Sequence, residues 1–392
     1  MSLFDFTSRR LAGCYSIADL RRAAKSRLPK MVFDYLDGGA EDEITLQRNS
    51  SAFANYELRP RFLVDVSTVN LSTTVLGQPI DFPVLLSPTG LSRLFHHHGE
   101  LAVIPAAARA GTIYSLSSVA SYNIETAAAA SDGPKWFQIY VWRDRAVLRD
   151  FIQRCREAGY KALCLTVDLP VLGQRERDMR NGMTMPPRLT PRSVFNVAMH
   201  PWWTWHYLTS PRPELANVAG IPGIGLGDIT TQARHANSQL DPSVTWDDVA
   251  WMMQEWGGPF AIKGLLTAED ARQAAELGVQ GIIISNHGGR QLDHSPATID
   301  VLPEIIDAVD GRAEVILDGG VRRGSDVVKA LALGARACMI GRGYLYGLAA
   351  GGEAGVSRAL EILRSEILRT MQLIGCTAID GLDSRYIRPR LK

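Results

Sequence analysis

Eight short apolar runs, which alternate with stretches of helical composition, constrain the fold of this chain more than any other feature. The runs are Pro83–Ser87, Ile113–Ser117, Trp136–Tyr140, Ala162–Val167, Phe260–Lys263, Gly281–Ser285, Val315–Asp318 and Ala337–Ile340. The helical stretches include Glu100–Ala110, Arg145–Ala158, Ala268–Leu277 and Ser325–Leu333. Strands that alternate with helices form parallel sheets, and eight such units favour a closed (β/α)8 barrel over a doubly wound sheet. The sequence therefore predicts an α/β fold of the TIM-barrel class, with the barrel at about residues 81–355.

Further segments flank or interrupt the predicted barrel, and we expect all of them to belong to a single domain of residues 1–392. Helices are expected at about Ser16–Lys25, where Ser16 and Asp19 resemble a capping box, and at Lys30–Glu43, where two glycines end the helix. The fourth and fifth strands are separated by too many residues for one connection, which predicts an insertion at about 186–241. A C-terminal tail of residues 356–392 carries one more helix.

Composition and charge exclude several classes of protein. The formal net charge of +1 gives no electrostatic reason to expect nucleic acid as a partner. The five cysteines are scattered, so neither a disulfide framework nor a zinc site is predicted. No apolar stretch is long enough for a signal peptide or for a membrane span of about 18 residues, and we expect a cytoplasmic location. The glycine-rich run Gly223–Gly227 follows no predicted strand, which disfavours a dinucleotide-binding fold.

Polar residues gather at the C-terminal ends of the predicted strands, where barrels of this class have their active sites. In chain order they are Thr89, Gly90, Ser117, Gln138, Tyr140, Thr166, Asp168, Lys263, Ser285, His287, Arg290, Asp318, Gly320, Arg322, Gly341 and Arg342. Burial alone does not explain such a set, because buried polar groups are costly unless they are paired. Turns with glycine and arginine after the seventh and eighth strands are typical of phosphate sites.

The stretch Gly281–Asp293, which reads GIIISNHGGRQLD, joins the sixth strand to a polar loop. Its three isoleucines indicate a buried strand. In the loop, His287 can move a proton near neutral pH, and Arg290 can bind a carboxylate through two parallel hydrogen bonds. The glycines let the backbone approach a ligand closely. We therefore expect this loop to carry out chemistry.

This stretch resembles the signature of the FMN-dependent 2-hydroxy acid dehydrogenases and oxidases, and the resemblance extends from about Leu28 to Gly355. The family includes glycolate oxidase, lactate oxidase, flavin-linked L-lactate dehydrogenase and mandelate dehydrogenase. The resemblance implies an enzyme that uses FMN to oxidise an L-2-hydroxy acid to the 2-oxo acid. A barrel that binds FMN without turnover, or one with another chemistry such as an isomerase, is the competing class.

The resemblance also implies roles for individual residues. The FMN-binding residues that it implies are Thr89, Gly90, Ser117, Gln138, Thr166, Lys263, Ser285, Asp318, Gly320, Arg322, Gly341 and Arg342. On the substrate side, Arg290, Arg175 and Tyr35 would bind the carboxylate, although Gln174 replaces the first arginine of the family's G-R-R segment. His287 would be the base with Asp168 as its partner, and Tyr140 would hydrogen-bond the substrate's hydroxyl. Whether His287 removes the hydroxyl proton or the α-proton stays open.

Two positions bear on the substrate and on the electron acceptor. Gly90 stands where glycolate oxidase-like members have alanine, and Val119 stands where they have tryptophan, so both enlarge the substrate-binding pocket. L-lactate is the first choice, with mandelate or another bulkier 2-hydroxy acid as the alternative. Glycine at the first position tends to accompany slow reaction with oxygen in the family. A quinone is therefore the expected acceptor, and an oxidase that makes hydrogen peroxide is the alternative.

The insertion contains HPWWTWHYL at His200–Leu208. One interpretation is an active-site lid with its own small core. The other is peripheral contact of residues 193–220 with the cytoplasmic face of the inner membrane, where tryptophan and tyrosine lie at the headgroup level. Some family members attach through an insertion at this place, which favours the second interpretation, and the family's C-terminal tails imply a homotetramer. No metal is expected, because adjacent histidines such as His96-His97-His98 lack the spacing of a metal-binding helix and would lie in a solvated loop.

Overall fold

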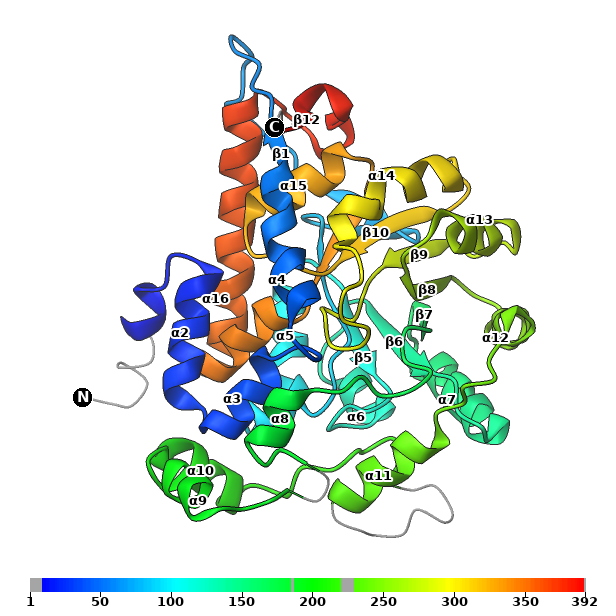
Figure 1. Cartoon of the computed structure of the whole chain (residues 1–392). Coiled ribbons are helices and arrows are strands. Elements are labelled where there is room, and N and C mark those ends of the chain that lie inside the picture. Colours follow the sequence, from blue (N-terminus) through cyan, green and yellow to red (C-terminus); the bar gives the residue numbers. More distant parts are fainter. Residues whose placement is uncertain (1–8, 185–186, 220–228, 391–392) are drawn as a thin grey trace.

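Eight parallel strands close into a barrel in the computed structural model of the protein, which describes residues 9–184, 187–219 and 229–390 (Figure 1). The strands are β4 (Val84–Leu86), β5 (Tyr114–Ser117), β6 (Lys135–Tyr140), β7 (Ala162–Thr166), β8 (Phe260–Leu265), β9 (Gly281–Ile284), β10 (Glu314–Asp318) and β11 (Ala337–Ile340). Each strand pairs with its neighbours in sequence, and β11 closes on β4. The predicted strands and the predicted (β/α)8 class are confirmed, and every strand end lies within two residues of the expected one.

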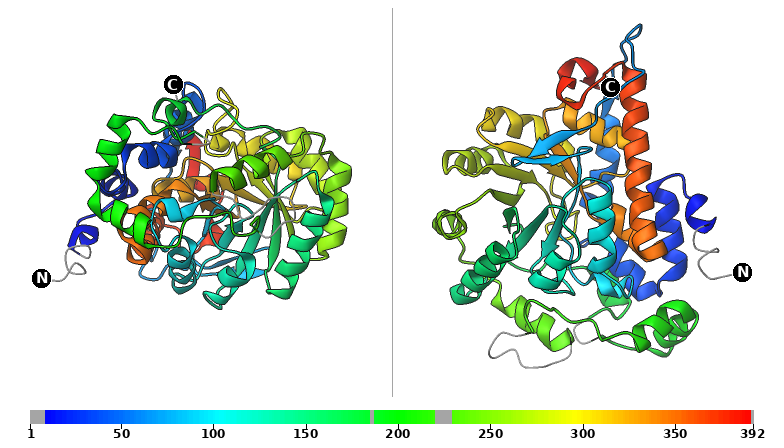
Figure 2. Two further views of the ribbon diagram at one scale, coloured as in Figure 1. Left: turned by 90° about the horizontal axis from the view of Figure 1, so that it is seen from below. Right: turned by 180° about the vertical axis from the view of Figure 1, so that it is seen from behind.

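Helices surround the barrel (Figure 2). They are α5 (Glu100–Arg109), α6 (Ile124–Ala129), α7 (Arg145–Glu157), α12 (Trp246–Trp256), α13 (Ala268–Glu276), α14 (Thr298–Val309), α15 (Gly324–Ala332) and α16 (Arg342–Ile374). In α7, the side chain of Asp144 caps the first turn, and Val147, Leu148, Phe151 and Ile152 form the buried face. The helix expected in the C-terminal tail is the second part of α16, which bends where Gly351 and Gly352 leave helical geometry.

A separate apolar cluster fills the barrel interior. It joins side chains of the barrel strands, such as Trp136 and Met339, to Val75 and Leu76 of the hairpin formed by β2 (Thr73–Val75) and β3 (Gln78–Ile80). The backbone N–H of Leu76 donates to Glu314 at the first residue of β10. The hairpin therefore closes the N-terminal end of the barrel, and this leaves the opposite end open for a site.

The segments before and after the barrel pack together. The N-terminal elements are α2 (Ile17–Arg27), α3 (Lys30–Asp37), α4 (Ile44–Ser51), η1 (Ala52–Asn55) and β1 (Tyr56–Leu58). The two expected N-terminal helices are confirmed, and the Ser16 side chain accepts the N–H of Asp19. After α16 come η3 (Ile379–Gly381), η4 (Ser384–Tyr386) and β12 (Ile387–Pro389), and β12 pairs with β1. This pairing gives structure to a C-terminal segment that has no clear sequence pattern.

The predicted insertion and the residues just before it form short helices at one end of the molecule, where α8 and α9 contact α3 (Figure 1). These helices are α8 (Glu176–Arg180), just before the insertion, and α9 (Pro191–Ala198), α10 (Pro201–Thr209) and α11 (Ile229–Gln239) within it. Pro186 and residues 220–228, including the run Gly223–Gly227, lie outside the described residues. Throughout the part of the chain that the structure describes, every helix is too short or too polar to cross a membrane.

Candidate active site

A cavity opens at the C-terminal ends of the strands, and most of the residues predicted for the site line it. These residues are Tyr35, Thr89, Gly90, Val119, Tyr140, Thr166, Arg175, Lys263, His287, Arg290, Asp318, Gly320, Arg322, Gly341 and Arg342. The other predicted residues, Ser117, Gln138, Asp168 and Ser285, are buried or half-buried behind the lining. The structure therefore brings together side chains from segments as far apart in the sequence as those of Tyr35 and Arg342.

His287, which lines this cavity, forms a close polar pair with Asp168. Nδ1 of His287 lies 2.8 Å from Oδ1 of Asp168, and the backbone N–H of His287 donates to Ser285 Oγ at 3.1 Å. The backbone of His287 has a φ of 55°, which residues other than glycine seldom adopt. A carboxylate at Nδ1 favours the tautomer with its proton there, so that Nε2 keeps a free lone pair. An imidazole held in this way can act as a base.

Arg290 is a half-buried cation with no acidic partner within salt-bridge distance among the described residues. Its Nη1 donates to the backbone carbonyls of Tyr35, at 2.8 Å, and Gly38, at 3.1 Å. Burial lowers the pKa of Arg290, and the charge of Arg175 lowers it further. The ring of Tyr35 lies between the two cations, 5.0 Å from Cζ of Arg290 and 5.5 Å from Cζ of Arg175. An anion bound in the cavity would relieve this repulsion, as a carboxylate does in a bidentate pair.

Lys263 is a second cation of the cavity, and it is both buried and paired. Its Nζ lies 2.8 Å from Asp318 Oδ2 and donates to Ser285 Oγ at 2.7 Å. Burial alone would lower the pKa of Lys263, but the carboxylates of Asp318 and Asp168 together outweigh burial and raise it. Asp318 also accepts the hydroxyls of Ser87 and Ser285. This network keeps a positive charge fixed at the base of the cavity.

Buried polar atoms without partners mark the place of a missing polar ligand. Nε2 of Gln138 and Oγ1 of Thr166 are buried without a hydrogen-bond partner among the described residues, while the Ser117 hydroxyl donates to Gln138 Oε1. Native proteins leave few such atoms unpaired. A flavin ring offers donors and acceptors along one edge, so these side chains at the ends of β6 and β7 fit FMN.

The part of the cavity that is predicted to bind the phosphate of FMN contains two arginines with different surroundings. Arg342 donates to the backbone carbonyls of Leu36, Gly288 and Gly38, so its guanidinium joins the N-terminal segment to the His287 loop. Among the described residues, the guanidinium of Arg322 hydrogen-bonds only to the neighbouring carbonyl of Val321. Its guanidinium therefore has more donors left for a phosphate, and a phosphate contact of Arg342 stays a prediction.

The sequence did not identify the apolar wall of the cavity. This wall consists of Trp142, Leu169, Leu172, Leu215, Ala236 and Leu240. Leu215, Ala236 and Leu240 come from the insertion, and Leu240 forms a β-bridge with Trp142. The later part of the insertion therefore covers the cavity as a lid, which a local sequence pattern does not reveal. Gly90 lies at the same wall, where a Cβ on it would be 2.8 Å from Cγ2 of Val119.

Comparison with known proteins agrees with this site. A family model described as FMN-dependent dehydrogenase matches residues 24–389. The chain is 45% identical to a putative L-lactate dehydrogenase of Mycobacterium tuberculosis, over 98% of this chain and 91% of that protein. It is 44% identical to an L-lactate oxidase of Nostoc sp., over 95% of this chain and 97% of that protein. A crystal structure of the monotopic membrane protein (S)-mandelate dehydrogenase matches with a TM-score of 0.92 and 39% identity, over 96% of this chain and all of that one. This chain therefore belongs to the family of FMN-dependent enzymes that oxidise 2-hydroxy acids.

Proposed function

We propose that this protein oxidises L-lactate, or a bulkier L-2-hydroxy acid, to the 2-oxo acid and passes the electrons to a quinone. The observation that carries the proposal is that His287, paired with Asp168, and the unpaired cation Arg290 line one cavity. A 2-hydroxy acid offers a carboxylate to the cation and a hydroxyl to the imidazole. A barrel that only binds FMN has no use for this combination.

In the proposed complex, the substrate's carboxylate binds between Arg290 and Arg175. Two cations that face one small cavity favour an anion, and the planar guanidinium matches both carboxylate oxygens. The hydroxyl of Tyr35 would add a hydrogen bond, because its ring lies against both guanidinium groups. These contacts orient the substrate's α-carbon, and orientation is itself a large part of catalysis.

Proton removal is the task of His287. FMN, when bound, takes up the two electrons that the α-carbon of the substrate loses. Nε2 of His287 accepts either the hydroxyl proton or the α-proton, and Asp168 stabilises the resulting imidazolium. Burial raises the pKa of Tyr140, so its phenol stays protonated and can donate to the substrate's hydroxyl oxygen. The ammonium of Lys263 would supply fixed positive charge beside the cofactor.

The apolar wall supports a bulkier acid as a second candidate substrate. Leu169, Leu172, Leu215 and Leu240 offer aliphatic contacts that the methyl group of lactate would use only in part. An aromatic or branched side chain would bury more apolar surface there, at roughly 25 cal/mol per Å². One or two methylene groups change affinity by only about 1–3 kcal/mol, so we expect both kinds of acid to react.

A quinone acceptor agrees with the exposed apolar surface of α9 and α10. Phe195, Met199, Trp205 and Leu208 are each more than 60% exposed. Large apolar side chains gathered on two adjacent helices are typical of protein or membrane contacts. The matched (S)-mandelate dehydrogenase is itself called a monotopic membrane protein. We propose that these helices rest on the membrane in which the quinone is dissolved.

Vesicle sedimentation tests the membrane contact. Deletion of residues 193–220 is unsuitable, because Leu215 lines the cavity and Val218 is buried. The triple variant Phe195→Ser, Trp205→Ser, Leu208→Ser alters only exposed side chains, and Leu373→Ser on α16 is the matched control. We expect the wild type and the control to sediment with vesicles of anionic phospholipid and the triple variant to stay in solution. Equal sedimentation of all three would refute the proposed contact.

The visible spectrum tests the reaction itself. We expect the purified protein to be yellow and to bleach when L-lactate or L-mandelate is added without oxygen. Slow return of colour in air, and fast return with a soluble quinone, would support the dehydrogenase; fast return in air would identify an oxidase. If the protein is yellow but no 2-hydroxy acid bleaches it, the proposed reaction is refuted, although the barrel would still bind FMN.

A further inference from the structure

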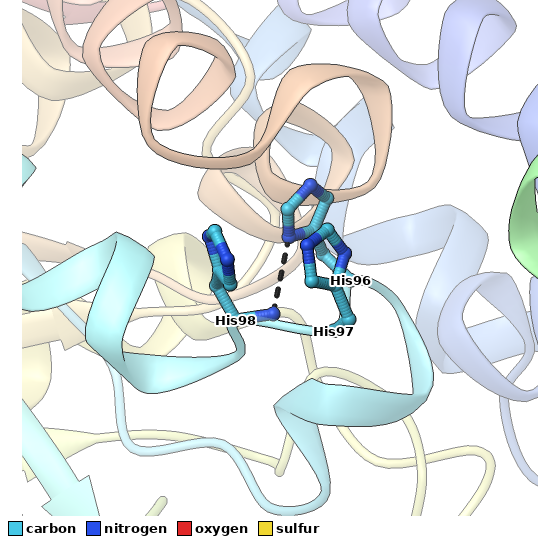
Figure 3. A group of neighbouring side chains, drawn as sticks. All are labelled: His96, His97 and His98. Atoms are coloured by element: carbon cyan, nitrogen blue, oxygen red, sulfur yellow. Dashed lines mark hydrogen bonds between the residues drawn. The ribbon is translucent and has the colours of Figure 1, made fainter. Parts of the chain in front are cut away.

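Three consecutive histidines gather their rings on one side of the turn between β4 and α5 (Figure 3). One ring nitrogen of His96, one of His97 and one of His98 all lie within 4.8 Å of one another. The turn is closed by the N–H of Gly99, which donates to the carbonyl of His96 at 2.8 Å, and Gly99 has a φ of 48°. The expectation of a solvated loop is wrong for His96, which is only 7% exposed, and holds only for the exposed His98.

We propose that His96, His97 and His98 bind one divalent transition-metal ion, such as Zn²⁺ or Cu²⁺. The group offers only imidazole nitrogens, and such a donor set favours Zn²⁺, Cu²⁺ and Ni²⁺ over Mg²⁺ and Ca²⁺, which prefer oxygen. Three protein ligands and a water molecule would complete a tetrahedral shell. Small rotations of the side chains would bring the three nitrogens to metal-binding distance.

Two ring nitrogens in the cluster lack a good hydrogen-bond partner. Nδ1 of His97 is buried and has none among the described residues. Nδ1 of His96 accepts only the backbone N–H of His98, at 3.3 Å, which is long for a hydrogen bond (Figure 3). Buried imidazole nitrogens are usually satisfied, so both atoms indicate a missing partner. A metal ion would supply that partner to both at once.

A small cavity adjoins two of the three histidines. A cavity of about 10 Å³ lies beside His96 and His97 under α10, and this is about the room that one water molecule needs. His206 of α10 stacks on His97 with ring centroids 4.0 Å apart, and Trp202 lies 5.4 Å from the ring of His96. The three histidines are absent from the lining of the catalytic cavity. The ion would therefore steady the turn beneath α10 rather than take part in the oxidation.

Nearby cations limit the affinity of the proposed site. Arg27 lies over the ring of Trp202, and Arg93 donates to the carbonyls of Pro211 and Arg212. These two cations repel a dication, so we expect micromolar rather than tighter binding.

Calorimetric titration of the full-length, FMN-loaded protein with Zn²⁺, without a polyhistidine tag, tests the site. We expect one ion per chain, and at least a tenfold loss of affinity in His97→Gln and in His98→Gln. Because His98 is exposed, His98→Gln should fold normally even if a change at His97 does not. His294→Gln, at an exposed histidine outside the cluster, is the matched control and should bind as the wild type does.

A second readout identifies the ligands directly. With one equivalent of Cu²⁺, the electron paramagnetic resonance spectrum of the wild type should show coupling to several imidazole nitrogens, and His98→Gln should show fewer. No saturable Zn²⁺ binding by the wild type would overturn the proposal. Equal affinity of the wild type, His97→Gln and His98→Gln would also overturn it, because the ion would then bind elsewhere.

Discussion

His287 and Asp168 are 119 residues apart in sequence, yet Nδ1 of the imidazole lies 2.8 Å from Oδ1 of the carboxylate. The second oxygen of Asp168 is buried and has no hydrogen-bond partner among the described residues. The carboxylate is therefore oriented chiefly by the imidazole. This pair decides which tautomer of His287 faces the cavity, and so whether the ring can accept a proton.

Replacement of the base should separate cofactor binding from chemistry. We expect His287→Gln to retain FMN, because the predicted flavin contacts lie on other residues, and to reduce it with substrate about 100- to 10,000-fold more slowly. Asp168→Asn should also slow the reaction, because an amide does not stabilise the imidazolium. Stopped-flow absorbance without oxygen measures both rates. Flavin reduction at nearly the wild-type rate in His287→Gln would contradict the proposed role.

Substitution of Arg290 should affect substrate binding. Arg290→Lys keeps a charge but loses the planar pair of donors, so we expect KM for the hydroxy acid to rise about 10- to 100-fold. Arg180→Lys on α8, whose side chain is 74% exposed, is the matched control and should leave KM unchanged. Steady-state assays with a dye as the electron acceptor give KM for both variants. An unchanged KM in Arg290→Lys would show that the carboxylate binds elsewhere.

Contact between Gly90 and Val119 predicts a non-additive pair of substitutions. A Cβ on residue 90 would lie 2.8 Å from Cγ2 of Val119 and 3.0 Å from its carbonyl oxygen. Overpacking of this kind costs about 1–3 kcal/mol, so Gly90→Ala should unfold at a lower temperature than the wild type. Val119→Ala removes Cγ2 and should restore part of the loss in the double variant. Additive changes of the unfolding temperature in the double variant would contradict the contact. Gly381→Ala is the control, because a Cβ at residue 381 meets no close neighbour.

The barrel could be predicted from the sequence because the apolar runs that indicate its strands are local patterns. Buried parallel strands need apolar runs, and the residues that end these runs must face the open end of the barrel whatever the loops do. His287, Arg290 and Lys263 could therefore be expected from the sequence alone to share a site. A histidine can accept a proton and an arginine can bind a carboxylate. These side chains together therefore indicated an anionic ligand from which a proton is removed.

Features that depend on long-range packing did not follow from the sequence. Leu215 and Leu240 line the cavity only because the insertion folds back over the strand ends. Arg342 was predicted to bind phosphate, but its donors meet the carbonyls of Leu36, Gly38 and Gly288, which are distant in sequence. His96 is buried because α10 covers the turn that carries it. In each case the partner is set by the tertiary fold rather than by neighbouring residues.

Asp37 joins four helices, and its ionisation should stabilise the N-terminal segment. Its carboxylate accepts Nε and Nη2 of Arg21 on α2, Nη1 of Arg177 on α8 and the hydroxyl of Tyr346 on α16. Burial alone would raise the pKa of Asp37, but the hydrogen bonds from Arg21 and Tyr346 outweigh burial and lower it to about 2.

The pKa of Asp37 is lower in the folded than in the unfolded state, so its contribution is complete above the unfolded value of 3.8 and is lost as pH falls towards about 2. A shift of this size corresponds to about 2 kcal/mol. We expect Asp37→Asn to lose about that much free energy of unfolding at pH 7 and roughly half as much at pH 3. Asp307→Asn, at an exposed position of α14, should behave like the wild type at both pH values. A difference between Asp37→Asn and the wild type that stays constant from pH 7 to pH 3 would show that the carboxylate's charge does not stabilise this junction.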